Sequence, residues 1–168
     1  MTHYGLICPA STGHLNTMLP LGKELQQRGH RVTFIGGLDV ESKILAAGLE
    51  FKAIGESDYR SGAAAESLAQ LGKLTGREGL EYTVNLLRNG AAVLLWDAPK
   101  VIKEAGVEAL LVDQASPEGG TVADFLGIPF ITICSAVVLN RDESVPPHFT
   151  NWNYNRAWWG RLRNRVGY

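Results

Sequence analysis

The sequence predicts an α/β fold in which five parallel strands form one doubly wound sheet. As far as Cys134, apolar runs of strand length alternate with stretches of helical periodicity, an alternation typical of βαβ units. Glycine makes up 19 of the 168 residues, above the usual ~7%, and much of it stands at junctions between predicted strands and helices. Right-handed crossovers between consecutive strands then favour the strand order 3-2-1-4-5.

The first predicted strand is followed directly by the first predicted helix. A helical pattern with one apolar stripe follows the first strand. Because proline is tolerated in the first turn of a helix, Pro20 predicts that this helix begins near Asn16 to Leu19 and leaves His14 in the preceding turn. The predicted strands are His3 to Cys8, Arg31 to Ile35, Leu49 to Ile54, Ala109 to Asp113 and Pro129 to Cys134.

Five glycines and one N-cap residue mark the ends of the later predicted helices. Gly48, Gly106 and Gly127 stop helices, Gly76 and Gly79 separate two of them, and Asp97 can cap another that has Pro99 near its start. Ser135 to Thr150 reads as a loop, and the stretch from Asn151 to the end is compatible with a helix. The predicted helices after the first are Asp39 to Ala47, Ala63 to Leu74, Leu80 to Trp96, Asp97 to Ala105 and Thr121 to Leu126.

Composition narrows the class of protein. With 45% hydrophobic and 20% charged residues and a net charge of −1, the chain is an ordinary globular domain with no field that would attract nucleic acid. Cys8 and Cys134 each end a predicted strand and lack metal-ligand spacing, which favours small buried residues. A signal-peptide pattern and an apolar run of ~18 residues are both missing. We therefore expect a cytoplasmic protein.

Two titratable residues follow neighbouring strands. His14 comes after the first strand and Asp113 ends the fourth. In the order 3-2-1-4-5 these strands are adjacent, so both side chains should emerge at one edge, where open α/β sheets bind ligands. A carboxylate on one imidazole nitrogen fixes the tautomer and leaves the other nitrogen as a base. The plainer alternatives are a solvent-facing His14 at a helix start and a helix-capping Asp113.

A family resemblance rests on several motifs in combination. The sequence resembles the UDP-sugar-dependent glycosyltransferases of the GT-B fold, of the natural-product type, although many relatives have proline where this chain has Thr17. The likeness extends over almost the whole chain except Ser57 to Gly79, and the stretches Leu139 to Arg141 and Val145 to Trp152 add a likeness to the zeaxanthin glucosyltransferase group. The motifs that carry it are Gly13 to Asn16, Leu21 to Leu25, Arg28 to Phe34, Ala109 to Gln114 and Pro117 to Phe130.

The resemblance implies a function for the whole protein. Residues 1–168 would be an incomplete N-terminal, Rossmann-like, acceptor-binding domain, inactive alone, and the C-terminal nucleotide-sugar domain would be absent. The reaction would be an inverting, metal-independent and cofactor-free transfer of a hexose, from UDP-glucose, to a hydroxyl of a lipophilic molecule such as a carotenoid. His14 would be the base and Asp113 its partner. The acceptor site would include Ser11, Thr12, Gly13, Ser135 and Asn140.

Other interpretations stay open beside this one. The same cleft could belong to a non-catalytic Rossmann-type domain that binds a small ligand. A dinucleotide-dependent dehydrogenase is disfavoured, because the first turn lacks the glycine spacing and the second strand does not end in an acidic residue. The glycines of Gly119-Gly120-Thr121 could cradle an anion at a helix start, but an ordinary turn explains them more simply.

The last eighteen residues combine aromatic and basic side chains. Between Asn151 and Tyr168 there are three tryptophans, four arginines and no acidic residue, a combination that suits an interface with anionic lipid. We therefore expect peripheral membrane contact as one possibility. The alternative is a helix that packs on a missing part of the enzyme. The residues concerned are Trp152, Trp158, Trp159, Arg156, Arg161, Arg163 and Arg165.

Overall fold

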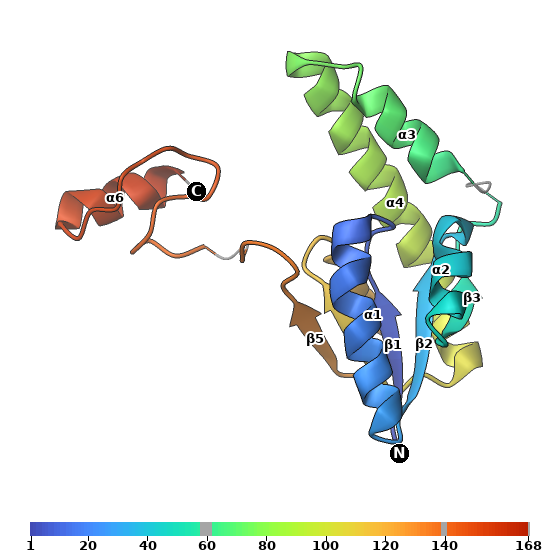
Figure 1. Cartoon of the computed structure of the whole chain (residues 1–168). Helices are drawn as coiled ribbons and strands as arrows, with labels where there is room; N and C mark the ends of the chain where they lie inside the picture. The colour runs from blue at the N-terminus through green and yellow to red at the C-terminus, as the bar shows by residue number, and fades with distance from the viewer. Residues whose placement is uncertain (58–61, 139–140, 168) are drawn as a thin grey trace. The chain divides into compact units, whose positions relative to one another are not determined.

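The computed structural model describes residues 1–57, 62–138 and 141–167, and it contains two compact units. The first unit, Met1–Ser135, holds the sheet and its covering helices. The second unit, Ala136–Tyr168, holds a single described helix (Figure 1). Each unit is described by itself below.

Five parallel strands form the sheet of the first unit, in the order β3-β2-β1-β4-β5. This confirms the predicted order. The register places Ile7 of β1 beside Val112 of β4, so the residues that follow β1 lie next to the end of β4. The strands are β1 His3–Ile7, β2 Arg31–Gly36, β3 Glu50–Ala53, β4 Ala109–Asp113 and β5 Phe130–Ile133.

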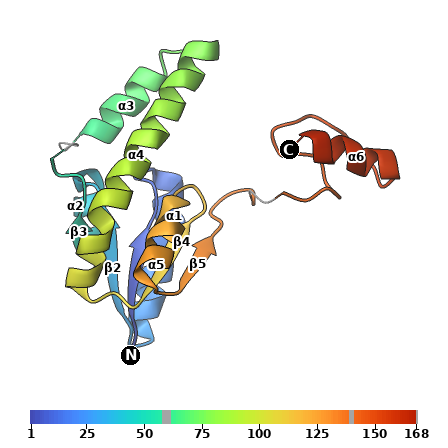
Figure 2. The same ribbon diagram turned by 180° about the vertical axis from the view of Figure 1, so that it is seen from behind.

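Helices cover both faces of this sheet, as a doubly wound fold requires. Side chains of α1 and α2, such as Met18 and Ile44, pack with Phe34 on one face, and side chains of α4 and α5, such as Ala98 and Val122, form the core on the other (Figures 1 and 2). The helices of this unit are α1 Thr12–Gln27, a 3-10 turn Leu38–Val40, α2 Glu41–Ala46, α3 Ala63–Leu71, α4 Gly76–Ala105 and α5 Glu118–Leu126.

The expected start of the first helix is wrong. Helix α1 begins at Thr12, because Ser11 has extended backbone angles and its carbonyl accepts a hydrogen bond from the Leu15 N–H at 3.1 Å. His14 therefore lies in the first turn of the helix rather than before it. Pro20 sits inside α1, where its ring removes one donor. The carbonyl that loses this donor belongs to Asn16, which is exposed, so water can hydrate it.

The expected separation of two helices between Leu80 and Ala105 is also wrong. Helix α4 is continuous over the 30 residues Gly76–Ala105, with Pro99 inside it. The carbonyl left without a donor is that of Leu95, a residue that is 42% exposed and open to water. Burial of Leu94, Ala98 and Ile102 against the sheet stabilises the helix on both sides of the proline.

The two cysteines differ. Cys8 is buried, as predicted, but Cys134 is exposed, contrary to the prediction. The reason is the position of β5 at one end of the strand order, where its Ile131 is 61% exposed. A strand at the edge of a sheet lacks the cover that buries a central strand.

The second unit contains helix α6, Trp158–Gly167. Arg163 lies over the Trp152 ring at 4.8 Å from its centroid. Asn164 is fully buried and donates a hydrogen bond to the Glu143 carbonyl at 3.1 Å. In the described part of the chain, none of the helices is both long and apolar enough to cross a bilayer.

Candidate active site

Helix α1 and strand β4 bring His14 and Asp113 together. His14 is the third residue of α1, and Asp113 is the last residue of β4. The His14 Nδ1 lies 2.8 Å from Asp113 Oδ2, which confirms the contact that the strand order predicts. The Asp113 side chain is fully buried, whereas 24% of the His14 side chain is exposed. The carboxylate of the pair is therefore shielded from solvent, whereas part of the imidazole is accessible to it.

Ser135 completes a triangle with these two residues. Its hydroxyl donates to Asp113 Oδ2 at 2.6 Å and lies 2.8 Å from His14 Nδ1. The Ala115 N–H donates to the other carboxylate oxygen at 2.8 Å. Burial raises the pKa of Asp113, but the hydrogen bonds from Ser135, the Ala115 N–H and His14 outweigh it and hold that pKa below its ordinary value.

The ionised carboxylate determines the tautomer of the histidine. Because Asp113 can only accept, the proton of a neutral His14 ring belongs on Nδ1. Nε2 then carries a lone pair, and no described residue forms a hydrogen bond with it. This arrangement can accept a proton from a bound hydroxyl group, and Asp113 would stabilise the resulting imidazolium.

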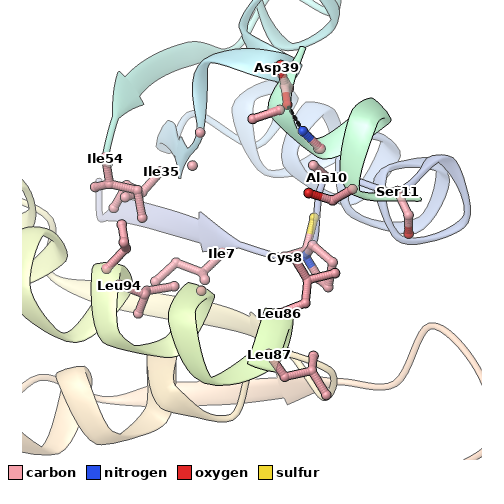
Figure 3. A pocket seen from close by; sticks show the side chains of 18 of the residues that line it. Ile7, Cys8, Ala10, Ser11, Ile35, Asp39, Ile54, Leu86, Leu87 and Leu94 are labelled. Carbon is pink, nitrogen blue, oxygen red and sulfur yellow. Dashed lines mark hydrogen bonds between the residues drawn. The ribbon is translucent and has the colours of Figure 1, made fainter. Parts of the chain in front are cut away.

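A largely apolar cavity of about 340 Å³ lies at the carboxyl end of β1 and β2. Its walls come from the turn between β1 and α1, the end of β2, and helices α3 and α4. Figure 3 shows Leu86, Leu87 and Leu94 of α4 on one side and Ser11 on another. Asp39 also lines the cavity. Its carboxylate accepts hydrogen bonds from the backbone N–H groups of Gly62 and Ala64 and so fixes the start of α3.

The residues predicted to bind the acceptor do not all line this cavity. Ser11 lines the cavity, whereas Thr12 and Gly13 are exposed and do not line it. The reason is the earlier start of α1, which turns these two residues into its first turn. Ser135 contacts the dyad rather than this cavity, and Asn140 lies outside the described residues.

Sequence reasoning missed the contribution of α3 and α4 to the cavity. Leu68 and Leu87 line it, yet the sequence predicted only the helices that carry them and assigned these residues no role. The signal that could have identified them is the length of the apolar stripe, which continues well beyond what the sheet can cover.

Packing explains the paired glycines of α5. A Cβ at Gly119 would lie 2.8 Å from a Val112 methyl, and one at Gly120 would lie 2.9 Å from the Phe130 ring. The helix approaches β4 and β5 too closely for a side chain, which favours the structural explanation over an anion cradle. Among the described residues there is no group of three or more His, Cys, Asp or Glu side chains placed to hold a metal ion.

Curated proteins similar to this chain are glucosyltransferases. The chain is 32% identical over 146 residues to a zeaxanthin glucosyltransferase of Pantoea ananas and 30% identical over 152 residues to one of Pseudescherichia vulneris, in each case over 87% of this chain and 34% of the relative. No protein-family model matches the sequence.

Solved structures share the fold. The glycotransferase of kitacinnamycin superposes with a TM-score of 0.64 at 24% identity, over 82% of this chain and 31% of that one. The calicheamicin glycosyltransferase CalG4 gives 0.62 at 20% identity, over 79% and 32%. The chain is similar to the N-terminal part of GT-B glycosyltransferases. It spans about a third of the length of the curated relatives it matches.

Proposed function

We propose that the full-length protein is an inverting glycosyltransferase that moves a hexose, from UDP-glucose, to a hydroxyl of a lipophilic acceptor such as a carotenoid. The observation that carries this proposal is the His14–Asp113 contact, which leaves His14 Nε2 without a hydrogen-bond partner among the described residues. Residues 1–168 would supply the acceptor side, and the nucleotide sugar would bind mainly in a C-terminal domain. The names of the relatives support the choice of sugar and acceptor.

In the proposed reaction, the residues of this chain and the two substrates account for every bond and proton, and no cofactor is needed. His14 Nε2 removes the proton of the acceptor hydroxyl as its oxygen attacks the anomeric carbon of the sugar. The bond from that carbon to the diphosphate breaks on the opposite side, and its electron pair leaves with UDP. Attack opposite the leaving group inverts the anomeric configuration. Asp113 stabilises the imidazolium, and Ser135 holds Asp113 in place.

The test is product analysis with the full-length protein. UDP-glucose and a carotenoid diol should give UDP and a β-glucoside, identified by mass and by the anomeric coupling in NMR. An α-linked product would contradict inversion. Binding of the diol without any UDP release would instead favour a non-catalytic ligand-binding domain. We expect residues 1–168 alone to release no UDP above background, because the dyad has no donor to act on.

We also propose that the full-length protein is cytoplasmic and contacts membranes through Asn151 to Tyr168. On α6, Trp158, Leu162 and Val166 recur at a spacing of four residues and are 76%, 52% and 80% exposed, as on helices that lie in a bilayer interface. Liposomes containing anionic lipid should carry the protein upward in flotation. The Arg156→Glu/Arg161→Glu variant should stay behind; unchanged flotation would remove the proposal.

A further inference from the structure

One face of α6 packs against the loop that leads into the helix. Gly160, Asn164 and Gly167 stand four and three residues apart and so share this face. A Cβ at Gly160 would lie 2.6 Å from the Asn155 carbonyl oxygen, and one at Gly167 would lie 2.6 Å from the Trp152 ring. Both ribbon views show the loop running alongside α6 (Figures 1 and 2). The absence of side chains at these glycines therefore lets the loop hold the helix closely.

The opposite face of α6 is apolar and exposed. Trp158, Leu162 and Val166 stand four residues apart, and each is more than half exposed. Leu162 is two residues from both Gly160 and Asn164, which places it about 200° around the helix from them. The loop thus holds α6 with its apolar side turned outward.

Arginines border this outer face on one flank. Arg161 and Arg165 stand four residues apart, each one residue before a member of the apolar face. The Arg165 Nε lies 3.5 Å from the Glu143 carboxylate, in an ion pair exposed on both sides that contributes little to stability and leaves the guanidinium available to another anion. Arg163 differs, because it lies over the Trp152 ring at 4.8 Å from its centroid.

We propose that α6 lies flat on an anionic bilayer, with its apolar face among the acyl chains and with Arg161 and Arg165 bound to lipid phosphates. The inference rests on the membrane contact proposed above and adds the face of the helix and the chemical group it binds. Residues 136–168 hold five arginines and two acidic residues, a net charge of +3, whereas the chain as a whole carries −1. This concentration of charge favours a phosphate surface, which guanidinium groups bind in a bidentate manner.

A protein surface, such as another part of the enzyme, is the other candidate for the apolar face. It would bury Trp158 before any lipid is added, whereas a bilayer buries this side chain only on binding. In the full-length protein without vesicles we expect acrylamide to quench the fluorescence of Trp158, measured as the difference between wild type and Trp158→Phe. Anionic vesicles should protect the wild type, and equally Trp96→Phe, but protect Trp158→Phe less. Shielding of Trp158 without vesicles, or equal protection of all three proteins, would overturn the proposal.

The charge variant is Arg161→Gln/Arg165→Gln, measured by co-sedimentation of the full-length protein with vesicles of phosphatidylglycerol and phosphatidylcholine. Its vesicle Kd should rise about 30-fold, since each arginine near an anionic surface contributes about fivefold. Arg161→Lys/Arg165→Lys keeps the charge without the bidentate contact and should fall between this variant and the wild type. The matched control, Lys100→Gln/Lys103→Gln, removes two exposed charges from α4 and should bind as the wild type does. An equal loss in the control, or wild-type affinity in the lysine variant, would overturn the contact with phosphate.

The apolar variant is Leu162→Gln/Val166→Gln, at positions exposed enough for the fold to persist. Its vesicle Kd should rise at least about tenfold, and binding should stay sensitive to salt, because the arginines remain. Phe149→Gln changes an exposed apolar residue of the loop instead and should leave the Kd unchanged. Wild-type affinity in the apolar variant would overturn the orientation of α6.

Vesicle binding and sugar transfer separate this inference from the proposals it rests on. If the wild type binds anionic vesicles and the α6 variants bind them equally well, the membrane contact stands and this orientation falls. If the wild type does not bind them, both fall. Transfer to a short soluble alcohol, measured without vesicles, tests the transferase activity independently of either result.

Discussion

The two edges of the sheet carry the same three chemical groups in different settings. At the carboxyl edge, His14, Ser135 and Asp113 form a triangle. At the amino edge, His3 Nε2 lies 2.8 Å from the Thr33 hydroxyl, which donates to Glu50 at 2.9 Å. Both sets join a histidine, a hydroxyl and a carboxylate from elements that are distant in sequence.

The settings differ in what is left for a ligand. The second nitrogen of His3, Nδ1, bonds the Gly106 carbonyl at 3.1 Å, and His3 is only 6% exposed. Both ring nitrogens of His3 therefore face protein groups. His14 uses Nδ1 alone and is partly exposed. The comparison teaches that a histidine beside a carboxylate is available as a base only where one ring nitrogen is not used inside the protein and the ring is partly exposed.

The largest expected effect comes from removing the free nitrogen. We predict that His14→Ala in the full-length enzyme lowers kcat by about 10²–10⁴-fold, because loss of a general base has that effect. Asp113→Asn should also lower kcat strongly, since an amide cannot stabilise the imidazolium. Steady-state assays of UDP release would measure both. A near-normal kcat in His14→Ala would end the assignment of the base and make the two edges equivalent.

At the other edge the effect should fall on stability. His3→Ala leaves the Gly106 carbonyl without its side-chain partner and removes one of the two partners of the fully buried Thr33 hydroxyl, and we predict a loss of about 2 kcal/mol in the free energy of unfolding. Urea denaturation followed by circular dichroism would measure it. Below the unfolding midpoint kcat should match that of the wild type; a large loss of kcat at full folding would give His3 a catalytic role and break the contrast.

The sequence predicted the residue contact at the carboxyl edge but not the one at the amino edge. Strand order and strand ends predicted the His14–Asp113 contact, because parallel strands put residues after β1 and β4 at one edge. The network of His3, Thr33 and Glu50 was not predicted, since it depends on side-chain directions across three strands. Nothing in the spacing of these residues distinguishes them from ordinary strand positions.

The misjudged elements share a physical cause. Pro20 and Pro99 were taken as marks of helix starts, yet both helices continue through them. Local propensity suggests a break, but burial of neighbours such as Met18 and Ala98 outweighs the loss of one hydrogen bond at an exposed carbonyl. The cavity was missed for a related reason: its walls depend on how far α4 extends past the sheet, which periodicity alone cannot give.

A smaller effect should come from Ser135, which donates to the buried carboxylate of the dyad. We predict that Ser135→Ala lowers kcat about tenfold, the equivalent of one hydrogen bond to a charged group, while the acceptor KM stays the same. Ser135→Thr keeps the hydroxyl and should restore most of kcat. If KM rises and kcat holds, Ser135 contacts the acceptor instead of positioning Asp113.

The smallest expected effect is the contribution of His3 to the pH dependence of the free energy of unfolding. Burial, and next the positive charge of Arg31, lower the pKa of His3, whereas an unfolded histidine titrates near 6.5. Below about pH 6.5 the unfolded chain therefore binds a proton that the folded chain does not, so the stabilising contribution of neutral His3 is complete above that pH. It is lost as the pH falls through the folded pKa. Asp113, whose pKa is also lowered, loses its contribution in a separate window below about pH 4.

Measuring the free energy of unfolding from pH 7.5 to pH 5 should thus give a decline of at most about 1.4 kcal/mol per pH unit from this residue. In His3→Gln the amide does not titrate, so the same range should give a shallower decline. The other histidines are present in both proteins, and the difference between the two curves belongs to His3. Parallel curves would mean that His3 titrates alike in the folded and unfolded states, and the amino edge would then lack the buried neutral histidine on which the contrast with His14 depends.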